Sequence, residues 1–420
     1  MSSKFNWLQG EVRALYDRNR QQGHAAWANL DYDFVCPSAE TYPFQWFWDS
    51  CFHAVALTHV DLERAKSEVR GLLANIHDDG MISHVTFWQR ERYEEMLSTY
   101  AIAYRTPYLS DCMQPPVIAD TVLHIVERGG GVAFAKETAP ALKRYHDWLD
   151  RVRDPDRDGL IATLQSDESG LDHTPKYDAY RGMADGGTMK AQDAAWRRVA
   201  DAYTAVGRDS AKMFETGAFI VEDTLVNAIY AKGLSALAKI LDIAGDAAGA
   251  EEMRRRALKT TDALVEKCFD SDAGLFFDLA GKEEKPLRVS TVSSLVPLVL
   301  EDLPEWVVDR VARHIEDPKA YASKYPVPSV SMAEPSFVPY YLEKLVWRGP
   351  TWINTNWYIA RGLRTHGLPE LARRIEQSSV ALIEKSSFKE YYHPHTGEGY
   401  GAPDFSWSAL ALDMAAAEGA

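Results

Sequence analysis

Four acidic side chains lie close together in the segment Gln165–Tyr180, which reads QSDESGLDHTPKYDAY. They are Asp167, Glu168, Asp172 and Asp178. Hydrolysis of a glycosidic bond uses two carboxyl groups, and one of them must hold a proton near neutral pH. A loop that is crowded with acids and restrained by Gly170 and Pro175 favours such a protonated carboxyl, because a neighbouring negative charge raises a pKa. A solvated loop with helix caps is the alternative that the spacing leaves open.

A second group of acids lies near the C-terminus, in the segment Phe388–Trp407, which reads FKEYYHPHTGEGYGAPDFSW. It combines three acids with aromatic side chains: Glu390, Glu398, Asp404, Tyr391, Tyr392, Tyr400 and Trp407. The C–H faces of sugar rings stack on aromatic surfaces, so acids beside aromatic rings indicate one wall of a sugar pocket. An ordinary aromatic-rich turn is the alternative.

Two further segments join aromatic rings to polar groups at the start of an expected helix. The segment Trp347–Trp357, WRGPTWINTNW, places an arginine and asparagines where they could bind hydroxyls or orient a carboxylate. The segment Tyr42–His53, YPFQWFWDSCFH, places a carboxylate beside tryptophan, where it could accept two hydrogen bonds from a terminal sugar. The candidate sugar-binding residues are Tyr42, Trp46, Trp48, Asp49, Trp347, Arg348, Gly349, Trp352 and Trp407, with His84, Trp88 and Gln114 as weaker candidates. Packed tryptophans, a helix cap at Asp49 and a structural histidine are the alternatives.

The segment Asp154–Gly159, DPDRDG, resembles the first half of a calcium-binding loop. Its candidate ligands are Asp154, Asp156 and Asp158. The twelfth position counted from Asp154 is Gln165, however, where a calcium loop has a bidentate glutamate. A structural calcium ion and a solvated acidic turn are therefore both open. The sequence has no phosphate-binding, dinucleotide-binding, zinc-protease or serine-hydrolase motif, so we expect no required cofactor.

The composition limits the partners of the 420-residue chain. A formal charge of −15 argues against nucleic acid and anionic membranes and favours a small, uncharged ligand. The N-terminus has no apolar signal region and there is no long apolar run, so we expect a cytoplasmic protein that does not span a membrane. Cys36, Cys51, Cys112 and Cys268 are scattered, which predicts buried free thiols. The oligomeric state is open.

Helical periodicity dominates the elements that must position these residues. Helices are predicted over 4–22, 48–59, 61–76, 115–128, 134–151, 191–206, 220–244, 247–268, 289–300, 304–315, 351–366, 368–385 and 406–418, and short strands over 81–87 and 274–278. The absence of a repeat argues against a solenoid, so consecutive helix pairs over this length predict an all-α, closed double ring in one domain, 1–420. Long loops, notably 77–114 and 152–190, are expected to gather at one end as a cap over the site.

Taken together, these motifs resemble glycoside hydrolase family 63, which includes processing α-glucosidases and hydrolases of mannosylglycerate and glucosylglycerate. The resemblance rests on FWDSCFH (47–53), MQPP (113–116), DPDRDGLI (154–161), ESGLDHTPKYD (168–178), WRGPTWINTNW (347–357) and KEYYHPHTGEGYGAPDFSWSAL (389–410), which occur in the family's order. It implies an (α/α)6 barrel and inversion of the anomeric configuration. It also implies that Asp172 is the general acid and that Glu390, rather than Glu398, is the general base. The two carboxyls are then expected to lie about 6.5–9.5 Å apart.

Three departures bear on the substrate. The acid loop reads QSDESG where the glycerate-releasing members resemble HPWESG, Val346 stands where they have tyrosine, and Phe405 stands where a polar contact with glycerate is expected. The sequence therefore favours an inverting, exo-acting α-glucosidase that acts on small, neutral α-glucosides. A glucosylglycerate or mannosylglycerate hydrolase is the alternative within the family, and a catalytically inactive sugar-binding protein is the alternative of another class.

Overall fold

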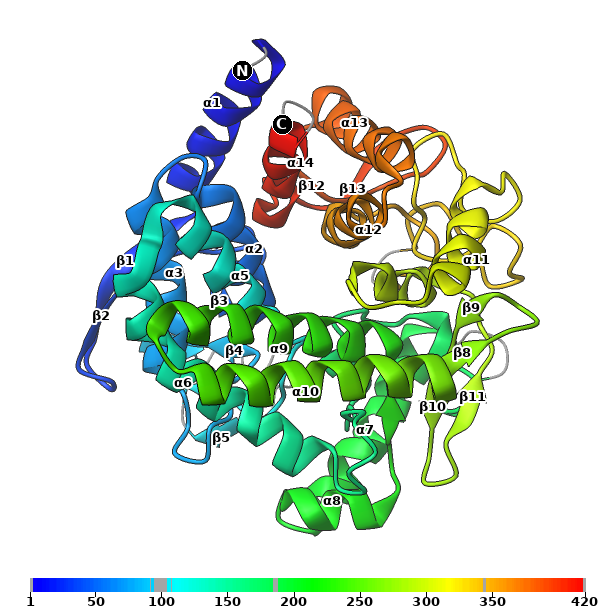
Figure 1. Ribbon diagram of the computed structural model, residues 1–420, viewed down its shortest axis with the longest axis horizontal. Helices are drawn as coiled ribbons and strands as arrows, with labels where there is room; N and C mark the ends of the chain where they lie inside the picture. Colours follow the sequence, from blue (N-terminus) through cyan, green and yellow to red (C-terminus); the bar gives the residue numbers. More distant parts are fainter. Residues whose placement is uncertain are drawn as a thin grey trace.

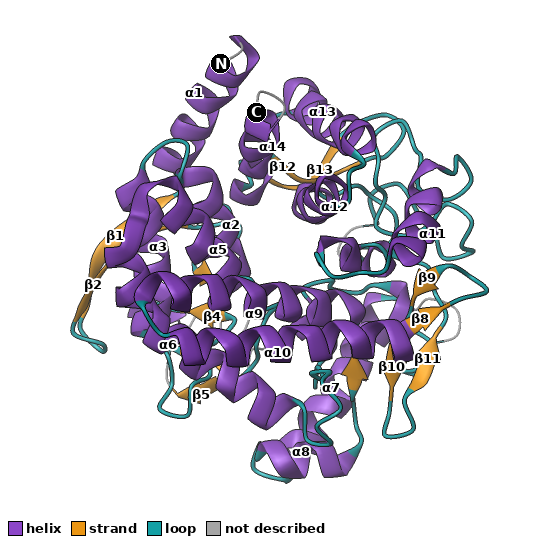
Figure 2. Ribbon diagram, in the orientation of Figure 1, coloured by secondary structure: helices purple, strands orange, loops and turns teal. Residues whose placement is uncertain are grey.

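The computed structural model describes residues 3–90, 92–93, 104–106, 108–183, 188–342 and 345–417. Over these residues the chain is predominantly helical, and its strands are short (Figures 1 and 2). The α-helices are α1 (Ser3–Arg18), α2 (Phe47–Leu57), α3 (Leu62–Ala74), α5 (Ile118–Ile125), α6 (Gly131–Arg153), α7 (Met189–Ala205), α8 (Ser210–Thr216), α9 (Thr224–Ala244), α10 (Ala247–Ala263), α11 (Glu305–Glu316), α12 (Ile353–Thr365), α13 (Pro369–Ser386) and α14 (Ala411–Ala417).

Six helical elements contact one another in a closed order. From α2 the order runs through α5, α9, the short turn η6 (Val296–Val299) and α12 to η7 (Ser406–Leu410) with α14, which contacts α2 again. Every residue of α2 is buried, as are most residues of α9, because helices that are apolar around most of their circumference must be enclosed. The more polar helices α3, α6, α10, α13 and α1 each pack against one of these inner elements.

Asp413 joins the two ends of this ring. Its carboxylate, on α14, accepts hydrogen bonds from Nε2 of His59 at 2.7 Å and from Nε1 of Trp357 at 2.8 Å. The guanidinium of Arg128 lies 3.4 Å away. Although burial acts in the opposite direction, the hydrogen bonds and charges of His124 and His59 hold the pKa of Asp413 well below its ordinary value. The first and last inner helices are therefore fastened by a buried, ionised carboxylate.

The strands form five small antiparallel sheets, which are drawn in orange in Figure 2. Their bounds are β1 (Arg20–Ala25), β2 (Leu30–Val35), β3 (Gln45–Trp46), β4 (Val85–Thr86), β5 (Tyr104–Thr106), β6 (Leu109–Ser110), β7 (Val221–Glu222), β8 (Phe269–Asp270), β9 (Leu275–Phe276), β10 (Asp278–Ala280), β11 (Lys285–Leu287), β12 (Lys389–Tyr392) and β13 (Gly399–Pro403). The strand orders of the five sheets are β1–β2, β11–β10–β7, β12–β13, β3–β4–β6–β5 and β8–β9. The pair β12–β13 matters most here, because β12 carries Glu390.

Most predicted helices are present, and the exceptions have local causes. The predicted helix 289–300 is instead two short 3-10 turns, because Pro297 interrupts a longer helix. The first predicted helix ends at Arg18 rather than residue 22, because β1 begins at Arg20. The predicted strand 81–87 is reduced to β4, and 274–278 is divided between β9 and β10. Helix α8 was not predicted. The predicted cap loops 77–114 and 152–190 lie partly outside the described residues.

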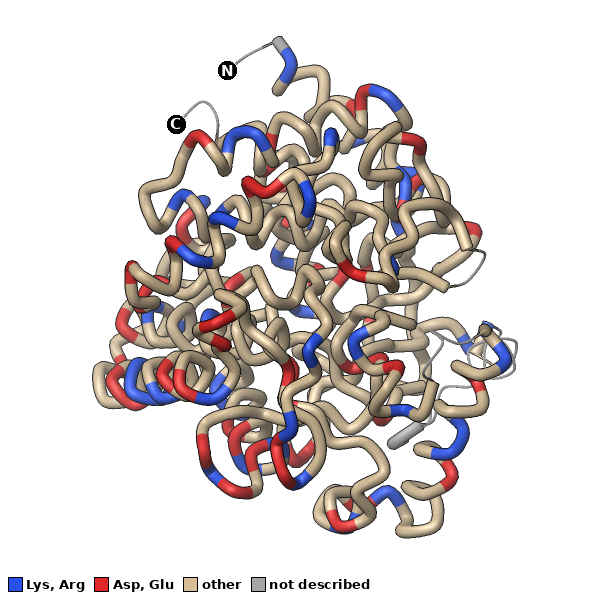
Figure 3. The backbone as a smooth tube through the Cα atoms, turned by 90° about the vertical axis from the view of Figure 1, so that its right-hand side faces the viewer, with Lys and Arg blue, Asp and Glu red and all other residues tan. Residues whose placement is uncertain are grey.

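Acidic and basic residues are interspersed along the backbone (Figure 3). Among the described residues, no helix has both the length and the apolar character that would be needed to cross a lipid bilayer. The four cysteines are free thiols, as predicted; Cys36, Cys51 and Cys268 are also buried, whereas Cys112 is only half-buried.

Candidate active site

One pocket brings together residues from all four segments that the sequence singled out. It is lined by Pro37, Tyr42, Trp46, Trp48, Asp49, Gln114, Gly170, Asp172, Val346, Trp347, Trp352, Glu390, Phe405 and Trp407. Both predicted catalytic acids and eight predicted sugar-binding residues are among them. Pro37 and Gly170 were not predicted, since neither carries a side chain that marks chemistry. Val346 and Phe405 were noted only as departures from the family pattern.

Aromatic rings build the walls of this pocket. The rings of Trp347 and Trp352 stack at 3.7 Å with an interplanar angle of 6°. Trp407 meets Trp48 edge-on at 5.5 Å between ring centroids, and its Nε1 donates to the carbonyl oxygen of Glu390 at 3.3 Å. Such flat apolar faces beside carboxylates can stack against the C–H faces of a sugar while the acids take its hydroxyls.

Gly170 allows the acid loop to lie directly on Trp48. Its backbone φ of +71° is in the left-handed region, and a Cβ at this position would lie 2.5 Å from the indole of Trp48. Only glycine meets both constraints. The indole is itself placed by Gln114, whose Oε1 accepts a hydrogen bond from the backbone N–H of Trp48 at 3.0 Å. Asp172 follows two residues after Gly170 and lines the pocket.

Glu168 has a structural role in the acid loop. It forms a buried, bidentate ion pair with Arg153, with N···O distances of 2.7 and 2.6 Å. It also accepts hydrogen bonds from the backbone N–H groups of Met113 and Leu164. Glu168 therefore ties the loop to the end of α6 rather than facing the pocket.

Asp178 and Asp167 are also bound to other side chains. Asp178 accepts two hydrogen bonds from Arg348, both at 2.8 Å, and Asp167 accepts one from Nε1 of Trp196 at 3.0 Å. Of the four acids in the loop, Asp172 is the one that lines the pocket. The structure thus separates four acids that spacing alone presented as equivalent, and the one that lines the pocket is the acid that the family resemblance implies.

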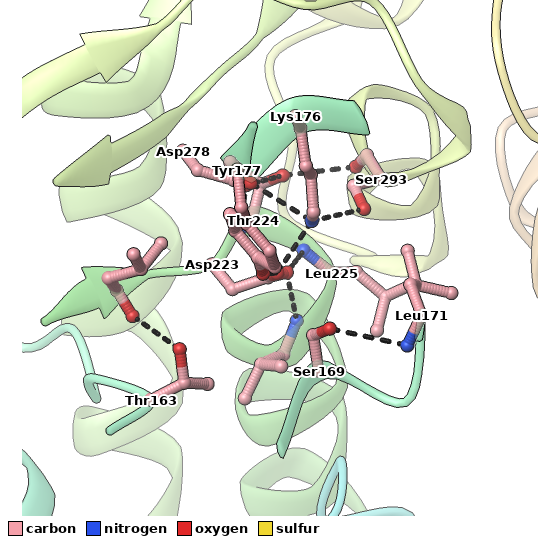
Figure 4. A network of polar contacts seen from close by, with 12 residues as sticks. Thr163, Ser169, Leu171, Lys176, Tyr177, Asp223, Thr224, Leu225, Asp278 and Ser293 are labelled. Atoms are coloured by element: carbon pink, nitrogen blue, oxygen red, sulfur yellow. Dashed lines mark hydrogen bonds and ion pairs between the residues drawn. The ribbon is translucent and has the colours of Figure 1, made fainter. Parts of the chain in front are cut away.

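Lys176 fastens the acid loop to the inner helix α9 (Figure 4). Its buried ammonium group donates to Asp223 at 2.5 Å and to Oγ of Ser293 at 2.7 Å, and lies 2.9 Å from Asp278. Asp223 also caps α9 by accepting from the backbone N–H groups of its first turn. Burial alone would lower the pKa of Lys176, but the two carboxylates outweigh this effect and raise it. The ammonium group is therefore charged, and it is shared as a counter-charge by two buried acids.

Replacing Lys176 by methionine is expected to lower the free energy of unfolding by about 3–5 kcal/mol, because Asp223 and Asp278 would be left buried without a counter-charge. Urea denaturation followed by circular dichroism measures this loss. Lys190→Met is the matched control, since Lys190 is exposed at the start of α7. Equal stability of the two variants would show that the ammonium group does not hold the loop.

Glu390 projects from β12 and is oriented by the facing strand. Its Oε2 accepts a hydrogen bond from the backbone N–H of Ala402 at 2.9 Å. A Cβ on Gly401 would lie 2.4 Å from the same oxygen, and the φ of this glycine is +71°. Burial raises the pKa of Glu390 to about 7, although the hydrogen bond from Ala402 acts in the opposite direction. The carboxyl can therefore exchange a proton near neutral pH.

The other two acids of the C-terminal cluster do not line the pocket. Glu398 is exposed and accepts a hydrogen bond from the hydroxyl group of Tyr400 at 3.2 Å. Asp404 forms an ion pair with Arg18 at 3.0 Å. This placement distinguishes Glu390 from Glu398, which the spacing of the sequence could not do.

The carboxyls of Asp172 and Asp49 also have raised pKa values. Asp172 lines the pocket, and its side chain is exposed there. Desolvation by the surrounding protein is the largest cause of its raised pKa, and the negative charges of Asp167 and Glu390 add to it. Burial is likewise the main cause for Asp49, with further contributions from Glu390 and Asp172. The pocket thus combines three mutually interacting carboxyls, an arrangement suited to acid–base chemistry.

His84 and Trp88 do not line the pocket, contrary to the sequence prediction. Nδ1 of His84 is 2.6 Å from Oγ of Ser110, and its ring lies against the edge of Trp46, which does line the pocket. Nε1 of Trp88 donates to Gln45 at 2.7 Å, and its ring packs against the β1–β2 hairpin. Nδ1 of His84 and Nε1 of Trp88 are thus both bonded to other side chains inside the protein.

Arg348 and Gly349 are also predicted site residues that the pocket does not include. Both outer nitrogens of the Arg348 guanidinium are bound to Asp178, and the backbone N–H of Gly349 donates to Ser329 at 2.9 Å. Arg348 instead links the loop of Trp347 to the acid loop. Its role is to join two walls of the pocket.

The calcium-like loop has a different set of acids than the sequence predicts. Both carboxylate oxygens of Asp154 accept backbone hydrogen bonds within the turn, from Asp158 and Gly159, so Asp154 acts as a cap. Asp156 and Asp158 instead gather with two acids from distant segments, Glu222 and Glu284, with one oxygen from each of the four within 4.8 Å of the others.

Lys267 supplies a positive charge to this acidic cluster. Its ammonium group forms ion pairs with Asp158 and, at 2.5 Å, with Glu284. Glu222 is nearly buried, and burial followed by the charges of Asp158 and Glu284 raises its pKa to about 8. The cluster offers oxygen donors of the kind that calcium prefers, but a lysine already lies among them.

The chain is similar to known glycoside hydrolases over nearly its whole length. A family model described as mannosylglycerate hydrolase MGH1-like glycoside hydrolase domain matches residues 42–408. The mannosylglycerate hydrolase of Thermus thermophilus is 32% identical over 408 residues, which cover 90% of this chain and 96% of that protein. The glucosylglycerate hydrolase of Mycolicibacterium hassiacum is 28% identical, covering 88% and 91%.

A comparison with a solved structure also shows similarity over nearly the whole chain. The mannosylglycerate hydrolase of Thermus thermophilus in complex with Tris and D-glycerate superposes with a TM-score of 0.85 at 29% identity, covering 96% of this chain and 99% of that one. The similarity therefore extends over the helical ring and the pocket segments together.

Proposed function

The chain belongs to the mannosylglycerate hydrolase MGH1-like glycoside hydrolase family, and from this premise we propose that it removes one α-linked hexose from glycerate with inversion of configuration. The chain is a glycoside hydrolase, and the resemblance to glycoside hydrolase family 63 is confirmed. Within that family, the relatives favour the glycerate alternative over the neutral α-glucosidase that the sequence departures favoured.

One observation carries the mechanism: Asp172 and Glu390 come from loops far apart in the sequence and line the same aromatic pocket. Asp172, protonated, donates its proton to the glycosidic oxygen as the bond to the anomeric carbon breaks. Glu390, ionised, removes a proton from a water molecule that attacks the opposite face of the sugar. The remaining acid, Asp49, is placed to accept hydrogen bonds from the sugar hydroxyls.

The closed order of inner elements supports an (α/α)6 barrel as the scaffold. Five of the six inner elements each pack against an outer helix, which is the pairing that a six-hairpin ring requires. The loops of the acid cluster and of Trp347 would then meet at one end of the barrel and enclose the sugar. We treat residues 1–420 as one catalytic domain.

Proton NMR during the first turnovers tests this function directly. Mannosylglycerate and glucosylglycerate are the first substrates, and p-nitrophenyl α-glucoside and α-mannoside, kojibiose, nigerose and trehalose complete the panel. Inversion predicts that the β-hexose forms first and the α-anomer follows only by mutarotation. Initial release of the α-hexose would contradict inversion, and no release from any α-glycoside would contradict the proposed activity.

For the acidic cluster beside the DPDRDG turn, we propose that Lys267 takes the place of a bound calcium ion. Addition of millimolar Ca²⁺ is then expected to leave the thermal midpoint of the wild-type protein unchanged. Lys267→Met should make the midpoint rise with Ca²⁺ concentration, because a ligand that binds only the folded state stabilises it. Lys285→Met, which removes an exposed lysine of β11, is the control. A thermal midpoint of the wild-type protein that falls on addition of a chelator would show instead that this cluster binds a calcium ion.

A further inference from the structure

A row of aromatic rings leads from the pocket to the protein surface. Trp352, which lines the pocket, stacks on Tyr391 with 4.5 Å between ring centroids. Tyr391 meets Tyr400 edge-on at 6.1 Å, and Tyr400 is in turn 6.1 Å from Tyr341. The row therefore continues the aromatic wall of the pocket through three tyrosines.

Exposure increases along this row. Trp352 and Tyr391 are buried, Tyr400 is half-buried and Tyr341 is 51% exposed. Tyr391 directly follows Glu390 in β12, and the ring of Tyr400 contacts both Tyr391 and Tyr341. The outer end of the row is therefore accessible, and its inner end lies next to a carboxyl that lines the pocket.

Two loops hold the outer tyrosines beside the pocket. The antiparallel register of β12 and β13 places Tyr400 opposite Tyr391, directly after Glu390. The backbone N–H of Val338 donates to the carbonyl of Arg348 at 2.7 Å, which closes the segment that carries both Tyr341 and the pocket residues Val346 and Trp347. Tyr341 and the pocket residues Val346 and Trp347 therefore lie between two residues that are joined by this hydrogen bond.

From this geometry we propose that Tyr341 and Tyr400 form an outer subsite that binds a second sugar ring on the aglycone side. An exo-acting pocket holds a single terminal hexose, so any part of the substrate outside it belongs to the aglycone. Exposed tyrosine rings bind the faces of sugars at little cost in conformational entropy. The proposal rests on the proposed glycosidase function and extends its substrates to α-linked disaccharides and trisaccharides.

The charge of the pocket agrees with a neutral ring at this position. The described residues that line the pocket include three carboxyls and no lysine or arginine. The nearby cations Arg348, Lys176 and Arg153 are each paired with an acid. An uncharged pyranose needs no counter-charge at this position, whereas the anionic glycerate of the proposed substrates is held there by hydrogen bonds from uncharged groups.

Substrate discrimination by variants of Tyr341 tests the outer subsite. For each protein, kcat/KM is measured on the better of the two hexosylglycerates and on kojibiose, nigerose and their trisaccharide homologues, and the ratio of the two values is compared. Tyr341→Ala is expected to lower the ratio of oligosaccharide to hexosylglycerate about 3- to 10-fold, as the loss of a stacking contact implies. Tyr341→Phe keeps the ring and should restore the ratio. Tyr340→Ala is the matched control, because Tyr340 is its exposed neighbour.

The outcomes separate the two proposals. A ratio that is unchanged in Tyr341→Ala, or lowered equally in Tyr340→Ala, would overturn the outer subsite. So would a wild-type enzyme that hydrolyses a hexosylglycerate but none of the oligosaccharides, although the proposed function would then stand. Failure of the wild-type enzyme to release hexose from any of these substrates would overturn the glycosidase function itself.

Discussion

Replacing Asp172 by asparagine is expected to reduce kcat by about 10²- to 10⁴-fold, the usual contribution of a general acid. Asparagine has nearly the same shape as aspartate but cannot donate a proton to the departing oxygen. The pocket walls do not depend on this side chain, since Gly170 and Trp48 set the loop position. Steady-state kinetics should therefore show the loss in kcat, and calorimetric titration with the free hexose should show nearly unchanged binding.

The leaving group distinguishes a general acid from a binding residue. An aglycone such as p-nitrophenol departs without much help from a proton, so the Asp172→Asn variant should lose far less activity on p-nitrophenyl glycosides than on glycosides of ordinary alcohols. A residue that only binds the sugar would cause equal losses on both. Equal losses would therefore overturn the assignment of Asp172 as the acid.

Asp167 provides a control within the same loop. Its negative charge contributes to the raised pKa of Asp172, so Asp167→Asn should lower that pKa. The general acid would then lose its proton at a lower pH, and the alkaline limb of kcat/KM should move to lower pH while turnover is retained. A profile that does not move would show that Asp172 does not set this limb.

The sequence singled out most of the residues that line the pocket because they occur in short contiguous segments. Aromatic residues beside acids, as in FWDSCFH and KEYYHP, marked pocket walls that the structure brings together. The inner helices could also be predicted from the sequence, as α9 shows, because it is apolar around most of its circumference. The exception is the segment interrupted by Pro297, where the periodicity of apolar residues predicts a longer helix than the structure contains.

Contacts between side chains that are far apart in the sequence could not be predicted from the local motifs. Asp178 and Asp172 look alike in the acid loop, but Arg348, which pairs with Asp178, is 170 residues away along the chain. Trp88 and Trp48 both follow apolar residues, yet only Trp48 faces the pocket. The acids around Lys267 likewise converge from three separate segments. Which polar group is already paired inside the fold is decided by such contacts, and a local motif does not contain them.

Replacing Glu390 by glutamine is expected to lower kcat by about 10²- to 10⁴-fold, because no other carboxyl is oriented by Ala402 to activate the attacking water. The base works only when ionised, and burial raises the pKa of Glu390 to about 7. Wild-type kcat/KM should therefore rise as the pH increases through about 7, and the loss of the proton of Asp172, whose pKa is also raised, should set the alkaline limb. These limbs describe the coupled pair of carboxyls.

Glu390→Gln should remove the acidic limb from the residual activity. Glu398→Gln, which changes an exposed acid of the same cluster, should leave both the rate and the limb in place. Because a loss of folding would lower the rate without changing the shape of the profile, an acidic limb that survives in Glu390→Gln would exclude Glu390 as the base, whatever the size of the loss in kcat.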